Sequence, residues 1–230
     1  MENLPRQAFG RARPVLSPRQ TPRPFVLAPD LLEEQPPALV QDGAWLVSAV
    51  AAETRIMTPD GPRSAGLLAP GDQVLTLDHG ALPLLWVGHR TATPAQIAER
   101  PDIGAIEIPA HAIAGGEPRL PLRVSPQAGI LLDLAGGPDD GLLLRAEDLV
   151  GHAGIRRAPA AQVTYVQFLF RHHAIVAANG LLLESFHPAW LRPVRGDCRQ
   201  RAEILSILPE LDHGTDFYGP EVRQRAARQR

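Results

Sequence analysis

The chain has 230 residues, of which 44% are apolar, so it is long and hydrophobic enough for one domain with a buried core. Its formal net charge of −2 gives no basic field that would attract nucleic acid. A single cysteine, Cys198, excludes a disulfide within the chain and a cysteine-rich metal site.

No apolar run approaches the ~20 residues that a membrane-spanning helix needs, and the N-terminus lacks the apolar core of a signal peptide. We therefore expect a cytoplasmic protein, or one exported by a route without an N-terminal signal peptide. Neither nucleic acid nor a membrane is expected as a partner, and no cofactor, metal or small-molecule ligand is predicted.

Residues that interrupt regular secondary structure are frequent, with 24 prolines and 20 glycines. These residues divide the chain into short pieces, which favours short strands joined by turns over long helices. The composition also changes twice along the chain. Residues 1–43 are proline-rich and are predicted to form a disordered arm, residues 44–188 carry the strand patterns, and residues 189–230 form a polar, arginine-rich extension.

The strand patterns begin after residue 53. Residues 54–58 alternate in the manner of a strand, and the Pro-Asp-Gly at 59–61 has the chemistry of a tight turn. A second turn of this kind, at 70–72, precedes a strand at 73–77. An apolar strand is predicted over 82–87.

Later segments alternate between strands and short helices. A short helix is predicted over 94–100, a strand over 106–108 and a β-branched, aromatic strand over 163–170. Asn179-Gly180 between apolar runs is a strong signal for a two-residue hairpin. In the extension, 203–211 is predicted to form a short helix.

The last ten residues, 221–230, are rich in Arg and Gln and predict a second, solvated helix.

Several segments resemble, in the same order, the blocks of the bacterial Hint (hedgehog/intein) domain family. They read Thr-Arg-Ile-Met-Thr-Pro-Asp-Gly at 54–61, Leu-Ala-Pro-Gly-Asp at 68–72, Trp-Val-Gly-His-Arg at 86–90, Ser-Pro-Gln-Ala at 125–128 and Ala-Asn-Gly at 178–180. The resemblance covers roughly residues 45–188 and implies a mostly β Hint fold of short, twisted strands. It also implies that the first and last strands lie side by side.

Hint domains rearrange their own backbone. A Cys thiol, or sometimes a Ser hydroxyl, attacks the preceding carbonyl, and a His protonates the departing nitrogen. The resemblance places the nucleophile at Ala49 and the general acid at Ala128. It gives supporting positions to Thr54, Ser125 and His173.

The departures from the family pattern fall on the reaction centre. A methyl group at Ala49 cannot attack a carbonyl, and one at Ala128 cannot donate a proton. The terminal His-Asn that inteins use for Asn cyclisation is replaced by Glu184-Ser185. The family also tends to have His at Gln167 and an acidic residue at Ala174. The first hypothesis is therefore a Hint domain that has lost self-cleavage and splicing and acts as a structural or interaction module, for a protein partner that the sequence does not identify.

Two further hypotheses stay open. An autoproteolytic domain could cleave near residues 47–49 by an N–O acyl shift at Ser48, although strand alternation predicts that Ser48 points away from the site. A small hydrolase or metal-binding protein could reuse the cleft, but the spacing of His111, His152 and His173 matches no zinc pattern. The sequence thus leaves open whether the protein is an enzyme.

Overall fold

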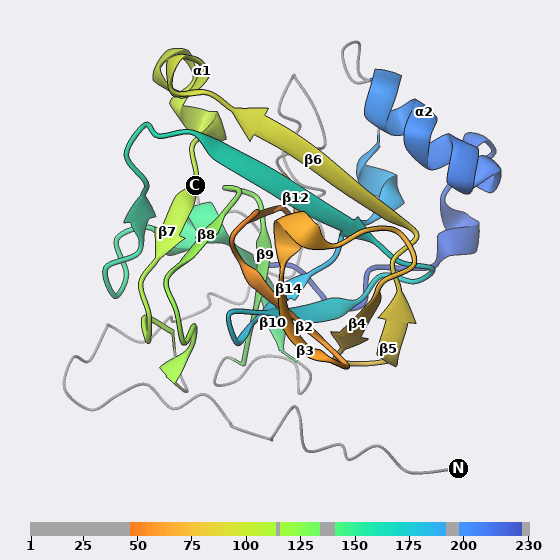
Figure 1. Ribbon diagram of the computed structural model, residues 1–230, viewed down its shortest axis with the longest axis horizontal. Helices are drawn as coiled ribbons and strands as arrows, with labels where there is room; N and C mark the ends of the chain where they lie inside the picture. Colours follow the sequence, from red (N-terminus) through yellow and green to blue (C-terminus); the bar gives the residue numbers. More distant parts are fainter. Residues whose placement is uncertain (1–46, 114–115, 134–140, 192–197, 227–230) are drawn as a thin grey trace.

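A computed structural model describes residues 47–113, 116–133, 141–191 and 198–226 (Figure 1). The predicted disordered arm, residues 1–43, lies outside the described residues. None of the described helices is both long and apolar enough to span a membrane.

Short strands are the main regular secondary structure of the described residues, beside two short α-helices, which confirms the predicted fold class. The strands are β1 (Val50–Ala51), β2 (Arg55–Thr58), β3 (Gly61–Ser64), β4 (Gln73–Thr76), β5 (Gly80–Pro83), β6 (Trp86–Ala92), β7 (Ile106–Ile108), β8 (Leu122–Val124), β9 (Gly129–Leu132), β10 (Leu142–Arg145), β11 (Arg156–Arg157), β12 (Val163–Leu169), β13 (Ile175–Ala178) and β14 (Leu181–Glu184). The α-helices are α1 (Pro94–Glu99) and α2 (Cys198–Ile207). The 3-10 turns are η3 (Ala65–Leu67), η4 (Pro101–Ile103), η6 (Ala146–Leu149), η7 (Pro188–Trp190), η8 (Pro209–Asp212) and η9 (Asp216–Tyr218).

The strands form two sheets. One has the order β11-β7-β8-β1-β12-β6, and the other has the order β10-β9-β14-β13-β2-β3, with β4 attached to β13 and β5 to β4. The long pair β6–β12 crosses the molecule, and α2 lies beside one end of it (Figure 1). Strand β1 lies in the interior of the first sheet, between β12 and β8. Neighbouring strands therefore flank β1, and the chain that enters it, on both sides.

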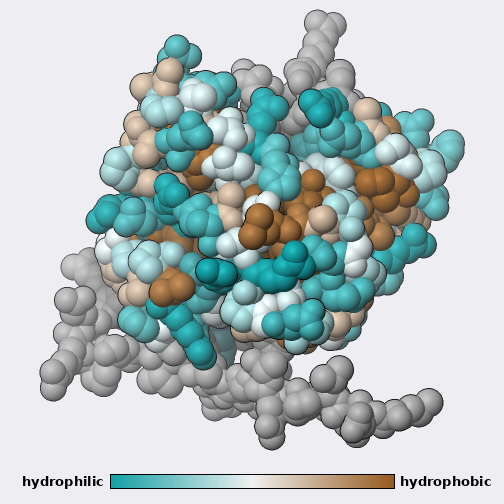
Figure 2. Space-filling model, viewed as in Figure 1, coloured by the Kyte–Doolittle hydropathy of each residue, from teal (hydrophilic) through white to brown (hydrophobic). Residues whose placement is uncertain are grey.

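Alternating apolar side chains from both sheets form the main core, which includes Ile56, Val124, Ile130 and Phe170. A second cluster lies under the C-terminal extension, where Ile204 of α2 packs with Phe186 and Trp190. The extension is thus joined to the domain by buried apolar contacts. The face in Figure 2 shows hydrophobic areas interrupted by hydrophilic side chains.

The predicted hairpin is present between β13 and β14. Asn179 and Gly180 both have positive φ, 50° and 96°, which is the backbone that a two-residue hairpin of type I′ requires. The Asn179 side chain also joins neighbouring segments. Its Oδ1 accepts from the Arg55 N–H at 2.8 Å, and its Nδ2 donates to the Pro121 carbonyl at 2.9 Å.

Three local predictions were wrong. The strand predicted over 82–87 is broken, because the chain passes from one sheet to the other between Pro83, where β5 stops pairing with β4, and Trp86, where β6 starts to pair with β12. The helix predicted over 203–211 begins earlier, at Cys198, and stops before Pro209, where η8 takes over. Residues 221–226 of the predicted terminal helix are not helical, since Arg225 forms a bridge with Leu143 of β10.

The expectation that the first and last strands are neighbours also needs correction. Strand β1 pairs with β12 and β8, whereas β14 pairs with β13 and β9. The two ends meet through side chains, because Ser48 before β1 contacts Glu184 at the end of β14.

Candidate functional site

Ala49 and Ser125 are brought together at the start of β1. The Ala49 N–H donates to Ser125 Oγ at 3.1 Å, and the Ser125 N–H donates to the Ala49 carbonyl at 2.9 Å. Neither residue is exposed to solvent. The hydroxyl of Ser125 is therefore an acceptor for the backbone of the residue at the family's nucleophile position.

Ala128 lies in the turn that follows Ser125. Its N–H donates to the Ser125 carbonyl at 3.1 Å, its carbonyl accepts from the Ala146 N–H at 2.9 Å, and the residue is fully buried. Thr54 is also buried and is tied by its backbone to Ala51 and Ala65, at 2.9 and 2.7 Å. The loops around the family positions are thus fixed by backbone hydrogen bonds, while Ala49 and Ala128 present methyl groups.

Strand alternation does not set the direction of Ser48, which lies just before β1. Its φ of 52° is left-handed, so the chain before β1 does not keep the alternation of a strand. The Ser48 hydroxyl is buried and donates to Glu184 Oε1 at 2.8 Å.

Glu184 is the centre of a buried polar cluster, and its side chain has no exposed area. Oε1 also accepts from the Gly129 N–H at 2.9 Å, and Oε2 forms an ion pair with Arg225 Nη2. A Cβ at Gly129 would lie 2.3 Å from Glu184 Oε1, so this close approach requires glycine. Both carboxylate oxygens are therefore engaged.

His173 is buried beside this carboxylate, with Nε2 at 3.7 Å from Glu184 Oε2. Its Nδ1 accepts from the Val222 N–H at 3.0 Å, so the ring proton lies on Nε2, which donates to the Ser185 carbonyl at 3.0 Å. Burial, together with the nearby His187, lowers the pKa of His173 to about 3. The imidazole is therefore neutral near pH 7.

Gln167, where the family tends to have His, binds the backbone before Ser48. Its Nε2 donates to the Val47 carbonyl at 2.6 Å, and its Oε1 accepts from Gln200 Nε2 of α2 at 2.7 Å. The C-terminal extension therefore orients the side chain that holds the Val47–Ser48 peptide. Among the described residues, no group of three or more His, Cys, Asp or Glu side chains is placed to hold a metal ion.

A family model described as Hint domain matches residues 48–190, which is more than half of the chain. The chain belongs to the Hint domain family. The two-sheet fold is thus a Hint fold, and the resemblance of the motif blocks is confirmed.

Solved structures similar to this Hint domain include inteins and an intein-like domain. The crystal structure of the MchDnaB-1 intein is 14% identical, with a TM-score of 0.39, over 60% of this chain and 100% of that one. The solution structure of a bacterial intein-like domain from Clostridium thermocellum is 16% identical, with a TM-score of 0.42, over 60% of this chain and 99% of that one. The gp41-1 intein is 16% identical, with a TM-score of 0.36, over 59% and 96%. A comparison with curated protein sequences gives no match.

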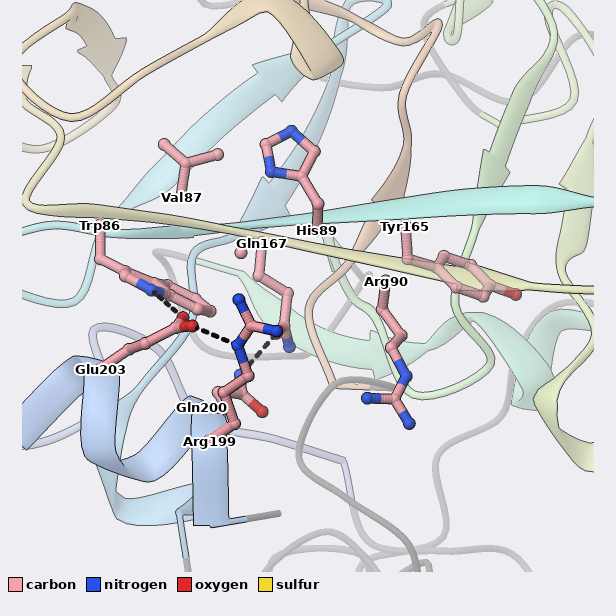
Figure 3. Close-up of a pocket in the computed structure, with 10 residues that line it drawn as sticks. Trp86, Val87, His89, Arg90, Tyr165, Gln167, Arg199, Gln200 and Glu203 are labelled. Atoms are coloured by element: carbon pink, nitrogen blue, oxygen red, sulfur yellow. Dashed lines mark hydrogen bonds and ion pairs between the residues drawn. The ribbon is translucent and has the colours of Figure 1, made fainter.

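The Hint domain also carries a groove of about 350 Å³ between β6 and α2. Trp86 and Arg90 point into it from one face of β6, whereas Val87 and His89 point to the other side (Figure 3). Gly88 lies beneath the Trp86 indole, since a Cβ there would lie 2.0 Å from the ring. From α2, Glu203 accepts from Trp86 Nε1 at 3.2 Å.

Sequence reasoning missed the partnership of Glu184 and Arg225. A single acidic residue at the end of the apolar run Leu181–Leu183 was a usable signal, because a buried carboxylate needs a partner. Nothing local marked Arg225 as that partner, since 41 residues separate the two.

Proposed function

We propose that this Hint domain does not cut or splice its own chain and acts as a structural or interaction module for a protein partner. The observation that carries the proposal is the pair Ala49 and Ala128. Both are fully buried at the positions of the nucleophile and the general acid, inside hydrogen-bonded backbone. Acyl transfer needs an attacking atom and a proton donor, and a methyl group supplies neither.

The polar groups around these positions support the same proposal. His173 is neutral, and its two ring nitrogens are occupied by Val222 and Ser185. Ser125 accepts from the Ala49 N–H. These side chains hold backbone groups in place, which is the behaviour of a structural network. The net charge of −2 is compatible with a protein partner and does not favour nucleic acid.

A second candidate function is self-cleavage at the Val47–Ser48 bond. The Ser48 hydroxyl donates to a carboxylate at 2.8 Å, and the Val47 carbonyl accepts from Gln167 at 2.6 Å. In such a step Glu184 takes the Ser48 Oγ proton, Oγ bonds to the Val47 carbonyl carbon, and the C–N bond breaks as the Ser48 nitrogen receives the proton. The product is an ester, which water hydrolyses to release residues 1–47.

Charge burial disfavours this second candidate. If Glu184 took up a proton, the buried Arg225 would lose its buried counter-charge and keep only the partly exposed Glu221. Breaking a buried ion pair in this way costs about 3–5 kcal/mol, a cost that adds to the barrier of the chemical step. We therefore prefer the first function.

The intact mass of the purified full-length chain separates the two. After prolonged incubation with and without hydroxylamine, which captures esters, we expect a single species at 24.9 kDa. Fragments that break between Val47 and Ser48, and that disappear in the Ser48→Ala variant, would instead establish the second candidate.

A further inference from the structure

The last described residues lie as an extended segment along β10. Leu143 and Arg225 form a parallel bridge. The Leu143 N–H donates to the Gln224 carbonyl at 2.8 Å, and the Ala226 N–H donates to the Leu143 carbonyl at 2.9 Å. Strand β10 stands at the end of its sheet, so its outer backbone groups are open to such pairing. The segment adds to a sheet edge as bound peptides do in β-augmentation.

One side chain anchors this segment in the domain. The Arg225 side chain is 10% exposed and forms its ion pair with the buried Glu184. Its guanidinium also lies over the Trp190 ring, 4.7 Å from the centroid. A carboxylate and an aromatic face are the two groups that recognise a guanidinium best. We call this arrangement of Glu184 and Trp190 the arginine pocket.

The residues before Arg225 complete the contact. Glu221 accepts from Trp190 Nε1 at 3.1 Å and from Arg225 Nε at 2.8 Å. The Val222 N–H donates to His173 Nδ1 at 3.0 Å. The segment thus provides hydrogen-bond or ion-pair partners for His173, Trp190 and Glu184. It does so mainly through two side chains, Glu221 and Arg225, which are four positions apart.

We propose that the edge of β10 and the arginine pocket form a peptide-binding site that the chain's own residues 221–226 occupy. The ligand is an extended peptide that has an arginine and, four positions before it, an acidic residue. A partner protein with such a segment binds this site in place of residues 221–226. The inference rests on the proposed function, because it assigns Glu184 to ligand recognition instead of catalysis. Because residues 221–226 are part of the same chain, their effective concentration at the site is in the millimolar range. A partner peptide therefore competes poorly unless the binding of residues 221–226 is weakened.

The first test uses the full-length chain and a labelled synthetic peptide with the sequence of residues 219–226. We expect the Arg225→Ala chain to bind this peptide at least tenfold more tightly than the wild-type chain, as measured by fluorescence anisotropy. A peptide carrying R225Q should lose this binding. One carrying R223Q, whose arginine pairs with Asp78 outside the pocket, should lose much less. Equal binding of all three peptides would overturn the proposal.

A second test covers the case in which Arg225→Ala does not fold. A protease site is placed at Gly214, in an exposed loop with a φ of 136°, and the folded wild-type chain is cut there after purification. We expect the labelled peptide to exchange with the cut segment. Permanent retention of the segment without exchange would show that it is an inseparable part of the fold. Mass spectra taken before exchange report any break near residues 47–49, so self-cleavage would be seen separately from a failure to exchange.

Discussion

Glu184 connects three parts of the chain that are far apart in sequence. Its carboxylate contacts Ser48 before β1, Gly129 at the start of β9 and Arg225 in the C-terminal segment. The carboxylate is completely buried, so its charge is balanced inside the protein by Arg225. Glu184 therefore links the segment before β1, the start of β9 and the C-terminal segment.

Neutralising Glu184 should be costly. Glu184→Gln keeps the size of the side chain but removes the buried counter-charge of Arg225, which then has only the partly exposed Glu221, so we expect a loss of about 3 kcal/mol in the free energy of unfolding. Urea denaturation of the variant and the parent chain measures this difference in the free energy of unfolding. In a cycle with Arg225→Met, the double variant should lose clearly less than the sum of the single losses.

The exposed pair Arg199–Glu203 provides the control for this cycle, because Arg199→Ala should cost less than about 1 kcal/mol. Additive losses for Glu184 and Arg225 would contradict a direct buried pair.

His173 should make the fold sensitive to mild acid. Its pKa is about 3 in the folded chain and near 6.5 when unfolded, so both states are neutral above pH 7 and the histidine then has no effect on stability. As the pH falls from 6.5 towards 3, only the unfolded state binds the proton, and stability is lost by roughly 1 kcal/mol per pH unit. Burial also lowers the pKa of His187, which acts in the same direction.

Urea midpoints between pH 7.5 and 5.5 test this expectation. The slope against pH should decrease in His173→Gln and persist in His172→Gln, since His172 is exposed. An unchanged slope in His173→Gln would contradict a neutral, buried imidazole in the folded state.

At the scale of elements, the hairpin at Asn179-Gly180 joins β13 and β14 and holds the loops around them. Asn179→Ala removes the side-chain hydrogen bonds to Arg55 and Pro121 and places Ala at a left-handed φ, so we expect a loss of about 2–3 kcal/mol in unfolding free energy. Asn179→Gly removes the same bonds but tolerates that φ, and should lose about 1 kcal/mol less. Thermal unfolding of both variants measures the difference, and equal losses would show that the backbone conformation does not matter here.

Two elements were predicted correctly because neighbouring residues in the sequence determine them. The hairpin and the helix α1, which begins with a capping box at Thr93 and Gln96, follow from neighbouring residues. The break between β5 and β6 was not predictable from apolarity, because it marks a change of partner strand from β4 to β12. The extended course of residues 221–226 was not predictable, because it depends on pairing with β10 and on burial of Arg225.

In the candidate site, too, some residues were predictable from the sequence and others were not. Ala49, Ser125 and Ala128 were placed by motif spacing, and the structure brings them together. The alternation from which the direction of Ser48 was predicted does not apply, because it does not extend to a residue with a φ of 52°. The role of Gln167 depends on Gln200 in α2, a contact that no local pattern in the sequence reveals.

At the scale of the molecule, the C-terminal extension belongs to the site. Helix α2 orients Gln167 through Gln200, and residues 221–226 supply the counter-charge of Glu184. The Hint scaffold is therefore intact and closed by its own extension, while the two positions that carry the reaction hold methyl groups. We therefore propose that self-cleavage is lost at these two residues while the scaffold remains.

The most direct measurement of that claim is the intact mass of the Ala49→Cys, Ala128→His double variant, incubated with a thiol beside the parent chain. We expect the parent to stay whole at 24.9 kDa and the variant to be cut before residue 49. Circular dichroism on both chains establishes that the variant is folded. A parent that releases the same fragment, or a folded variant that stays whole, would show that Ala49 and Ala128 do not decide whether this domain cleaves itself.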